Sequence, residues 1–103
     1  MRCRRPEPIP EEVRRAADLL GRRWTLSILY ASFEGAERFN EFRDALGRVP
    51  PATLTIRLTE LVEAGLLERR VLDTRPPGVE YRLTPVGRRF KPLLRALGRC
   101  SRT

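Results

Sequence analysis

The chain has 103 residues and a net charge of +8, and 41% of its residues are hydrophobic. This length suits one compact domain with a modest core, and the apolar content argues against disorder. No apolar run approaches the ~20 residues of a membrane span, and the basic N-terminus lacks the apolar stretch of a secretory signal. We therefore expect a cytoplasmic protein that does not bind membranes, and the positive charge favours a polyanionic partner.

Residues 1–10 are rich in Arg and Pro and are predicted to form a flexible basic tail. The first helix should span residues 11–20, where apolar side chains recur at helical spacing, and Gly21 is a plausible end for it. A second helix is expected over residues 24–33. It is apolar around much of its girth, which indicates a central place in the core.

Two shorter helices should follow, over residues 39–46 and 51–64. Gly47 is suited to end the first of them, and the Pro50-Pro51 pair is suited to open the second. The segment between the second and third helices, residues 36–38, can pair as a minor strand. Leu54, Leu58, Leu61 and Val62 form the inner stripe of the helix over 51–64.

The apolar period then changes from 3.6 to about 2, which predicts a hairpin with strands at residues 66–72 and 79–83. Thr84-Pro85 is a typical helix start and predicts a last helix over residues 85–98, kinked at Pro92. Residues 99–103 are expected to be a C-terminal tail. The domain itself would then cover residues 11–98.

Two short helices joined by a tight turn and followed by a two-stranded ribbon form the winged helix-turn-helix plan. In that plan the second helix enters the DNA major groove and the ribbon, or wing, holds the flanking backbone. The predicted fold class is therefore mainly α with a small β-hairpin. The helix over 51–64 is the predicted recognition helix.

The chain also resembles the HxlR-type winged helix-turn-helix transcriptional regulators. The stretches that carry the resemblance are LLGRRWTL at 19–26, RFNEF at 38–42, TLTIRLTEL at 53–61, AGLLER at 64–69 and EYRLTPVG at 80–87. Their order and spacing match over nearly the whole chain. The resemblance implies a prokaryotic origin, a homodimer formed through the first and last helices, and a two-fold DNA operator.

The candidate base-reading residues are the outward, N-terminal positions of the predicted recognition helix: Ala52, Thr53, Thr55, Ile56 and Arg57. Methyl groups suit the thymine methyl, hydroxyls can reach bases or phosphates, and an arginine can read guanine. Each threonine can equally be an ordinary solvated residue, and Arg57 can instead pair with Glu60 or Glu41. Family members often carry basic residues where this chain has Ala52 and Ile56, so its base recognition should differ from theirs.

Candidate contacts to the DNA backbone flank the turn and populate the wing: Arg38, Asn40, Arg43, Arg69, Arg70, Thr74, Arg75 and Arg82. Asn40 can also be a helix cap. Strand alternation places Arg69 and Arg70 on opposite faces, so at most one of them should face DNA, and Arg75 at the loop tip is the better candidate. Candidate dimer contacts come from the first and last helices: Val13, Ala17, Phe90, Leu93, Leu94 and Leu97.

The two cysteines, Cys3 and Cys100, lie at opposite ends of the chain and are expected to be free thiols. Many family members carry a Cys-Pro pair thirteen residues before the tryptophan, but Glu11 and Glu12 stand there in this chain. Thiol sensing by that route is therefore not expected. A switch through Cys3 and Cys100 remains an alternative, because pairing of the terminal helices would bring the two thiols together.

The charge is unevenly distributed, with a net +3 over residues 1–23, −2 over 24–65 and +7 over 66–103. The predicted helix-turn-helix is thus not itself a basic segment, and we expect the wing and flanks to supply most of the electrostatic grip. The main prediction is a homodimeric repressor that binds double-stranded DNA and is associated with the nucleoid. The alternative is a winged-helix scaffold that binds protein or RNA and has no operator.

An enzyme is the third and least favoured class. The chain contains no histidine, which removes the commonest general base and metal ligand. No nucleophile–base pair or phosphate loop is present either. We therefore expect no catalytic residue, metal or cofactor, and nothing in the sequence names a small-molecule effector.

Overall fold

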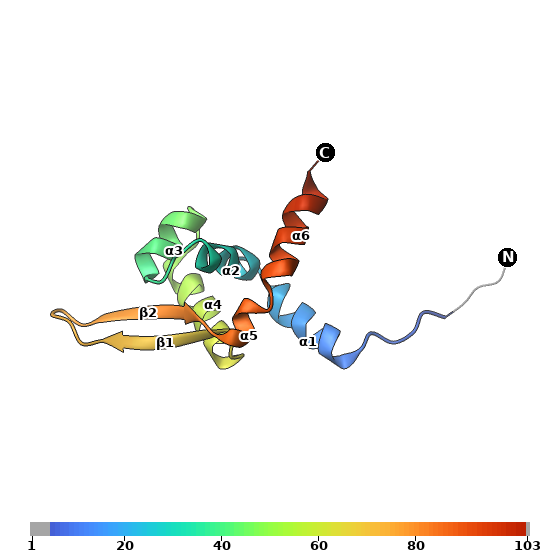
Figure 1. The fold of residues 1–103 in the computed structure, drawn as a ribbon, viewed down its shortest axis with the longest axis horizontal. Helices are drawn as coiled ribbons and strands as arrows, with labels where there is room; N and C mark the ends of the chain where they lie inside the picture. The colour runs from blue at the N-terminus through green and yellow to red at the C-terminus, as the bar shows by residue number, and fades with distance from the viewer. Residues whose placement is uncertain (1–4, 103) are drawn as a thin grey trace.

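The computed structural model describes residues 5–102 and comprises six helices and one hairpin within that range (Figure 1). The elements, in chain order, are α1 (Glu11–Leu20), α2 (Thr25–Phe33), α3 (Phe39–Leu46), α4 (Pro51–Glu63), β1 (Leu67–Leu72), β2 (Gly78–Leu83), α5 (Pro85–Arg88) and α6 (Lys91–Ser101). The predicted fold class, a mainly helical winged helix-turn-helix, is confirmed. Residues 5–10 form neither helix nor strand.

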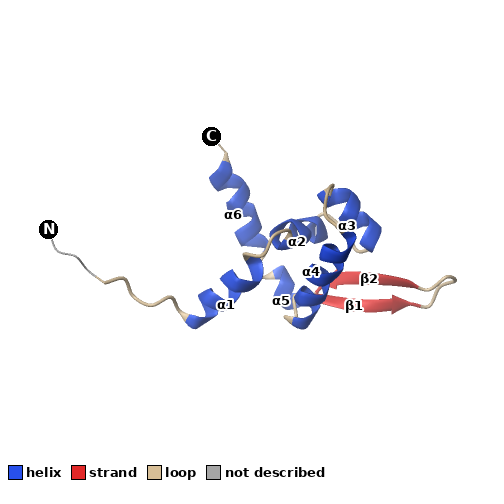
Figure 2. Ribbon diagram, turned by 180° about the vertical axis from the view of Figure 1, so that it is seen from behind, coloured by secondary structure: helices blue, strands red, loops and turns tan. Residues whose placement is uncertain are grey.

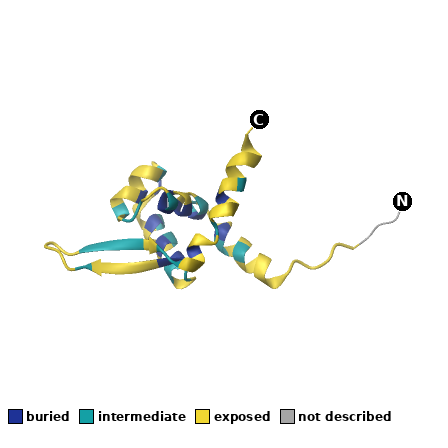
Figure 3. Cartoon of the chain, in the orientation of Figure 1, coloured by how far each residue is buried: buried dark blue, intermediate teal, exposed yellow. Residues whose placement is uncertain are grey.

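The core lies where α2, α3 and α4 meet the start of the hairpin (Figure 3). Ile28 and Leu29 of α2 have no exposed surface, and neither has Phe42 of α3. Burying side chains of this size stabilises a fold by about 1.5–3 kcal/mol each. The prediction that residues 24–33 form a central helix is therefore confirmed, with the helix beginning one residue later than expected.

The α3–α4 pair forms the helix-turn-helix. Gly47 ends α3 with a φ of 78°, a left-handed conformation that glycine adopts without strain. Pro51 then occupies the first turn of α4, where its missing N–H costs no hydrogen bond. From behind, α4 runs beside the start of the hairpin (Figure 2), so the wing emerges next to the recognition helix.

The wing is an antiparallel pair whose register runs from Leu67 opposite Leu83 to Leu72 opposite Gly78. A single bridge between Arg38 and Glu80 adds a third, minimal strand. The amide of Tyr81 also donates to the carbonyl of Glu37 at 2.7 Å. The expected minor strand at residues 36–38 is thus confirmed, and it anchors the base of the wing to α3.

Thr84 begins α5, as predicted, with its hydroxyl accepting the Gly87 N–H at 3.0 Å. The same hydroxyl donates toward the Gly65 and Leu66 carbonyls, at 2.5 and 3.2 Å, which joins the start of the wing to the last helices. Gly87 lies so close to the wing that a Cβ there would stand 2.1 Å from the Leu66 oxygen. Only glycine allows this approach of α5 to the hairpin.

The prediction of one kinked helix over residues 85–98 was wrong. The helix breaks after Arg88, and a separate helix, α6, begins at Lys91 with Pro92 in its first turn. Proline has no N–H to donate to residue 88, and its ring would clash with that carbonyl. Helix α6 also continues to Ser101, into the segment expected to be a tail, because Pro92 restarts the helix and nothing stops it at residue 98.

Helices α1 and α6 project from the compact body in different directions (Figure 1). Each is anchored at its inner end, through Leu20 in α1 and Leu94 in α6. Much of the remaining surface of these two helices is exposed (Figure 3). Among the described helices, none is both long and apolar enough to cross a membrane.

Candidate nucleic-acid interface

Helix α4 divides cleanly into an inner and an outer face. Leu54, Leu58 and Leu61 have no exposed surface, so they fix the helix against the core. The outer face, at the N-terminal end, bears Ala52, Thr55 and Ile56, which are exposed, and Thr53, which is half-buried. The structure therefore presents four of the five predicted base-reading side chains on one uncharged surface.

Two of the three threonine hydroxyls of α4, those of Thr55 and Thr59, are already used as donors. Thr55 Oγ1 donates to the Pro51 carbonyl at 3.1 Å, and Thr59 Oγ1 donates to the Thr55 carbonyl at 2.8 Å. Such bonds to the preceding turn are common for threonine in helices. Since the proton is committed, Thr55 offers a partner only a hydrogen-bond acceptor and a methyl group.

Arg57, the fifth candidate, is held within the protein rather than free. Its Nε donates to the Arg23 carbonyl at 2.9 Å, and its terminal nitrogen lies 3.1 Å from Glu60 Oε1. Glu60 also pairs with Arg22. The expected alternative, an internal pair with Glu60, is confirmed, and the side chain retains only 21% exposure.

The outer part of the wing exposes its cations. Arg69 lies opposite Tyr81 and Arg70 opposite Glu80, and both arginines are exposed. Arg75 at the tip is exposed too, and Thr74 Oγ1 donates to the Pro76 carbonyl at 2.9 Å, which shapes the tip. None of the ion pairs within residues 5–102 involves Arg69, Arg70 or Arg75.

Two other cations that contact the wing, Arg38 and Arg82, serve the fold instead. Arg82 lies 3.3 Å from Glu37 and 3.2 Å from Glu80. The guanidinium of Arg38 packs over Gly78, where an added Cβ would meet it at 2.7 Å. These two residues were predicted as backbone contacts, but the structure engages both in holding the wing to α3.

On α3, Asn40 and Arg43 are both exposed. The capping role considered for Asn40 is wrong, because Glu41 occupies it: Glu41 Oε1 accepts the amides of Glu37 and Arg38, each at 2.8 Å. These two backbone hydrogen bonds, with a smaller contribution from the charge of Arg38, lower the pKa of the Glu41 carboxyl. Asn40 and Arg43 remain available as candidate phosphate contacts.

Sequence reasoning missed a second basic feature beside α4, which we call the basic hollow. It measures about 300 Å³ and is lined by Arg23, Trp24, Arg48, Pro50, Thr53 and Arg57. Arg23 comes from the α1–α2 turn and Arg48 from the α3–α4 turn, so only the tertiary structure brings them to the recognition helix. The Arg22-Arg23 pair just before the tryptophan was the one local signal for it.

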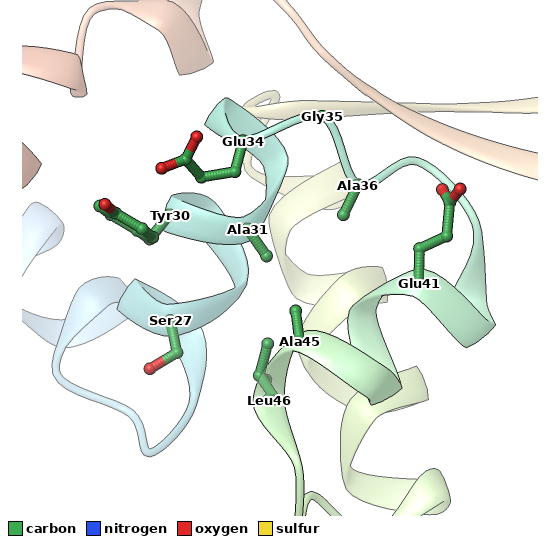
Figure 4. Close-up of a pocket in the computed structure, with 9 residues that line it drawn as sticks. All are labelled: Ser27, Tyr30, Ala31, Glu34, Gly35, Ala36, Glu41, Ala45 and Leu46. Atoms are coloured by element: carbon green, nitrogen blue, oxygen red, sulfur yellow. The ribbon is translucent and has the colours of Figure 1, made fainter.

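A larger hollow, of about 620 Å³, lies between α2 and α3. In Figure 4, Ala31, Ala36, Ala45 and Leu46 lie around the space between the helices, whereas Tyr30 and Glu34 point away from it. Glu41 stands at its α3 end. Because the charged groups at its rim are carboxylates, this hollow is unsuited to DNA and we exclude it from the candidate interface.

The candidate dimer contacts divide into exposed and buried residues. Val13 is 51% exposed, Leu93 41% and Leu97 43%, and Ala17 is also exposed. Phe90 is half-buried against the core. Leu94 was wrongly predicted as an interface residue, since it is only 6% exposed and completes the core of its own chain.

Of the two cysteines, Cys100 is an exposed free thiol on α6, while Cys3 lies outside the described residues. Over the described part of the chain, no group of three or more His, Cys, Asp or Glu side chains is arranged to hold a metal ion. The arrangement is that of a recognition surface: an uncharged helix face flanked by exposed arginines.

Comparison with known proteins identifies the family of this chain. Residues 19–102 match the HxlR-like helix-turn-helix family. The chain belongs to this family. It is similar to the uncharacterized HTH-type transcriptional regulator YdeP of Bacillus subtilis, with 39% identity over 77 residues, which are 75% of this chain and 60% of YdeP. It is also similar to the uncharacterized HTH-type transcriptional regulator Rv3095 of Mycobacterium tuberculosis, with 47% identity over 78 residues, 76% of this chain and 49% of Rv3095.

Solved structures of the same shape include the redox regulator HypR in its reduced form. The TM-score is 0.79 and the identity 34%, covering 86% of this chain and 88% of HypR. Reduced YodB, a transcriptional regulator from B. subtilis, has a TM-score of 0.79 and 28% identity, covering 88% of this chain and 89% of YodB.

This HxlR-like chain spans about half to three-fifths of the length of the curated relatives named above. The family and these relatives are transcriptional regulators rather than enzymes. The predicted membership of the HxlR-type family is therefore confirmed.

Proposed function

We propose that this chain is a homodimeric, sequence-specific DNA-binding regulator that inserts α4 in the major groove and lays its wing on the flanking backbone. The observation that carries the proposal is the exposed, uncharged outer face of α4 together with a wing that packs on α4 through β1 and whose arginines Arg69, Arg70 and Arg75 are exposed. A protein recognises base edges through close contacts of complementary shape, whereas it binds the phosphates of the DNA backbone through cationic side chains. Both kinds of surface are present here, on consecutive elements of the fold.

Base reading falls to Ala52, Thr53, Thr55 and Ile56. Their methyl groups match the thymine C5-methyl, and Thr55 Oγ1 can accept from adenine N6 or cytosine N4. Arg57 is proposed to act through its contacts with Arg23 and Glu60 rather than as a free reader of guanine.

Backbone contacts fall to the outer wing, through Arg70 or Arg69 and through Arg75, with Thr74 shaping the tip. Asn40 and Arg43 on α3 are proposed to add phosphate contacts on the other side of the groove. Arg38 and Arg82 are proposed to support the wing and not to bind DNA, because Arg38 packs over Gly78 and Arg82 pairs with Glu37.

Dimerisation is proposed to cover the apolar surface of α1 and α6, formed by Val13, Ala17, Leu93 and Leu97. Three of these four side chains are large hydrophobic groups that are 41–51% exposed, and burying them would be favourable. A two-fold dimer of this kind reads half-sites about 34–36 Å apart, or a multiple of that spacing. Repression is the simplest outcome, because occupying a promoter requires no further contact with the transcription machinery.

The test is to select bound duplexes from a random pool and to measure their affinities by fluorescence anisotropy. We expect a two-fold symmetric consensus that binds as a dimer, with affinity that falls steeply as salt rises. Equal affinity for all duplexes would reject the regulator and favour the alternative, a winged-helix scaffold for protein or RNA.

A pair of matched variants assigns the base reading to the N-terminal part of α4. Thr55→Val keeps the shape and removes the acceptor, so it should weaken the selected site by about 0.5–1.5 kcal/mol and change the preferred base at one position. Thr59→Val makes the same change one turn further along the helix and should leave the consensus unaltered. Identical consensus sequences from both variants would contradict base reading by Thr55.

A further inference from the structure

The basic hollow lies at the N-terminal end of α4, next to the proposed base-reading face. Three arginines line it: Arg23 from the α1–α2 turn, Arg48 from the α3–α4 turn, and Arg57 from α4. Thr53, a candidate base-reading residue, also lines it, so the hollow is continuous with the surface that faces DNA in our proposal.

The charge of this hollow is strongly positive. Within the described residues, none of the side chains lining it is acidic. The nearest identified carboxylate partner, Glu60, already pairs with both Arg22 and Arg57. Arg23 and Arg48 enter no ion pair within residues 5–102, and both are exposed.

The arginine of the α1–α2 turn is held in place. Trp24 has a φ of 82°, an uncommon left-handed conformation for a bulky residue, and the Arg23 guanidinium stacks over its ring at 4.8 Å. The Arg23 carbonyl accepts the Nε–H of Arg57 at 2.9 Å. This bond ties the backbone of the turn directly to the recognition helix.

The backbone of α4 adds donors on the same side. The first turn of any helix leaves N–H groups without helical partners. Here the preceding residue, Pro50, makes no side-chain cap, and the first intrahelical bond runs from the Leu54 amide to the Pro50 carbonyl. The amides of Ala52 and Thr53 therefore remain available beside three guanidinium groups, in a 13-residue helix whose dipole favours an anion at this end.

We propose that the basic hollow binds one phosphate of the DNA backbone in each half-site. The inference rests on the proposed DNA-binding function and names a contact outside the wing. Arg23 and Arg48 would hold the phosphate, and Arg57 would position Arg23. A phosphate held here sets how deeply the N-terminal end of α4 enters the groove, which links backbone binding to base reading.

The test measures the salt dependence of binding to the selected operator for Arg48→Ala and for Arg23→Ala. A dimer carries two such sites, so losing the phosphate from both would lower the magnitude of the slope of log affinity against log salt by about 1.8, and each single substitution, which leaves one arginine at the phosphate, should lower it by up to that amount. Each should also weaken binding to the selected operator by about tenfold. Arg23→Lys keeps the charge and should retain most of the slope.

Arg99→Ala is the matched control, because it removes the same charge from the far end of α6. It should leave the slope unchanged, and sedimentation of every variant checks that the dimer persists. Arg48 lies in an exposed turn, so Arg48→Ala decides the question even if Arg23→Ala fails to fold. Unchanged slopes with an intact operator affinity would overturn the phosphate site alone, whereas failure of the wild type to select any duplex would overturn the proposed function itself.

Discussion

Helix α4 and the wing differ in how they are anchored to the protein and in whether their cations are exposed. Three fully buried leucines hold α4 against the core, and its one cation, Arg57, is bonded to neighbours. The wing is held through Thr84 at its base and through the bridge of Arg38 to Glu80 along β2, and its arginines Arg69, Arg70 and Arg75 are exposed.

The difference separates two tasks of a DNA-binding surface. Reading a base requires atoms held within a fraction of an ångström, which a rigidly packed helix provides. Holding phosphates requires charge with less exact placement, which an exposed hairpin provides. We therefore expect damage to α4 to affect folding and sequence preference, and damage to the wing to affect affinity.

The largest expected effect tests how strongly α4 is anchored to the core compared with the wing. Leu58→Ala removes a side chain with no exposed surface and should lower the free energy of unfolding by about 2–5 kcal/mol. Val71→Ala trims a wing side chain that is 64% exposed and should change it by less than about 0.5 kcal/mol. Urea denaturation of both variants measures the contrast, and similar losses would show that the wing is as tightly packed as α4.

The next effect concerns the wing's charge. Arg70→Ala combined with Arg75→Ala should weaken binding to all duplexes alike and reduce the salt slope by up to about 3.6 per dimer. The consensus selected from a random pool should stay the same, in contrast to Thr55→Val. A changed consensus would mean that the wing reads bases, which would remove the division of tasks proposed here.

The smallest effect concerns the start of α3, which supports both regions. Glu41 accepts two backbone amides, and these bonds lower its pKa below the ordinary 4.5. A carboxyl with a lowered pKa stabilises the fold above its ordinary value, and that stabilisation is lost as the pH falls through the folded-state pKa. The excess stability of wild type over Glu41→Gln should therefore be constant above about pH 5 and shrink toward pH 3.

Thermal unfolding of the two proteins across this pH range measures the effect. Glu63→Gln, at the exposed end of α4, controls for the loss of a negative charge. A Glu41→Gln deficit that does not vary with pH would show that the carboxylate charge contributes nothing to the cap.

The sequence by itself determined the order and nearly all the bounds of the elements. Leu54, Leu58 and Leu61 recur at helical spacing, and the hairpin residues alternate, so local periodicity was enough to orient α4 and the wing. The helix start predicted from Thr84-Pro85 is also confirmed, because a helix cap depends on only a few neighbouring residues. The effect of Pro92 was misjudged: a proline can bend a helix or begin a new one, and its local sequence does not distinguish the two.

Only the tertiary structure decided which charges are free. Arg82 and Arg75 are both arginines of the predicted wing, and the sequence does not distinguish their roles. In the structure Arg82 pairs with Glu37 at the base of the wing, whereas Arg75 is exposed at its tip. The net charge counted along the sequence placed Arg23 and α4 in different segments. In the structure a hydrogen bond joins the Arg23 carbonyl to Arg57 of α4, 34 positions further along the chain. The periodicity of apolar residues is a property of neighbouring positions in the chain, so the fold could be predicted from this sequence. The partners of a charged side chain depend on the tertiary structure, so the basic hollow could not be predicted.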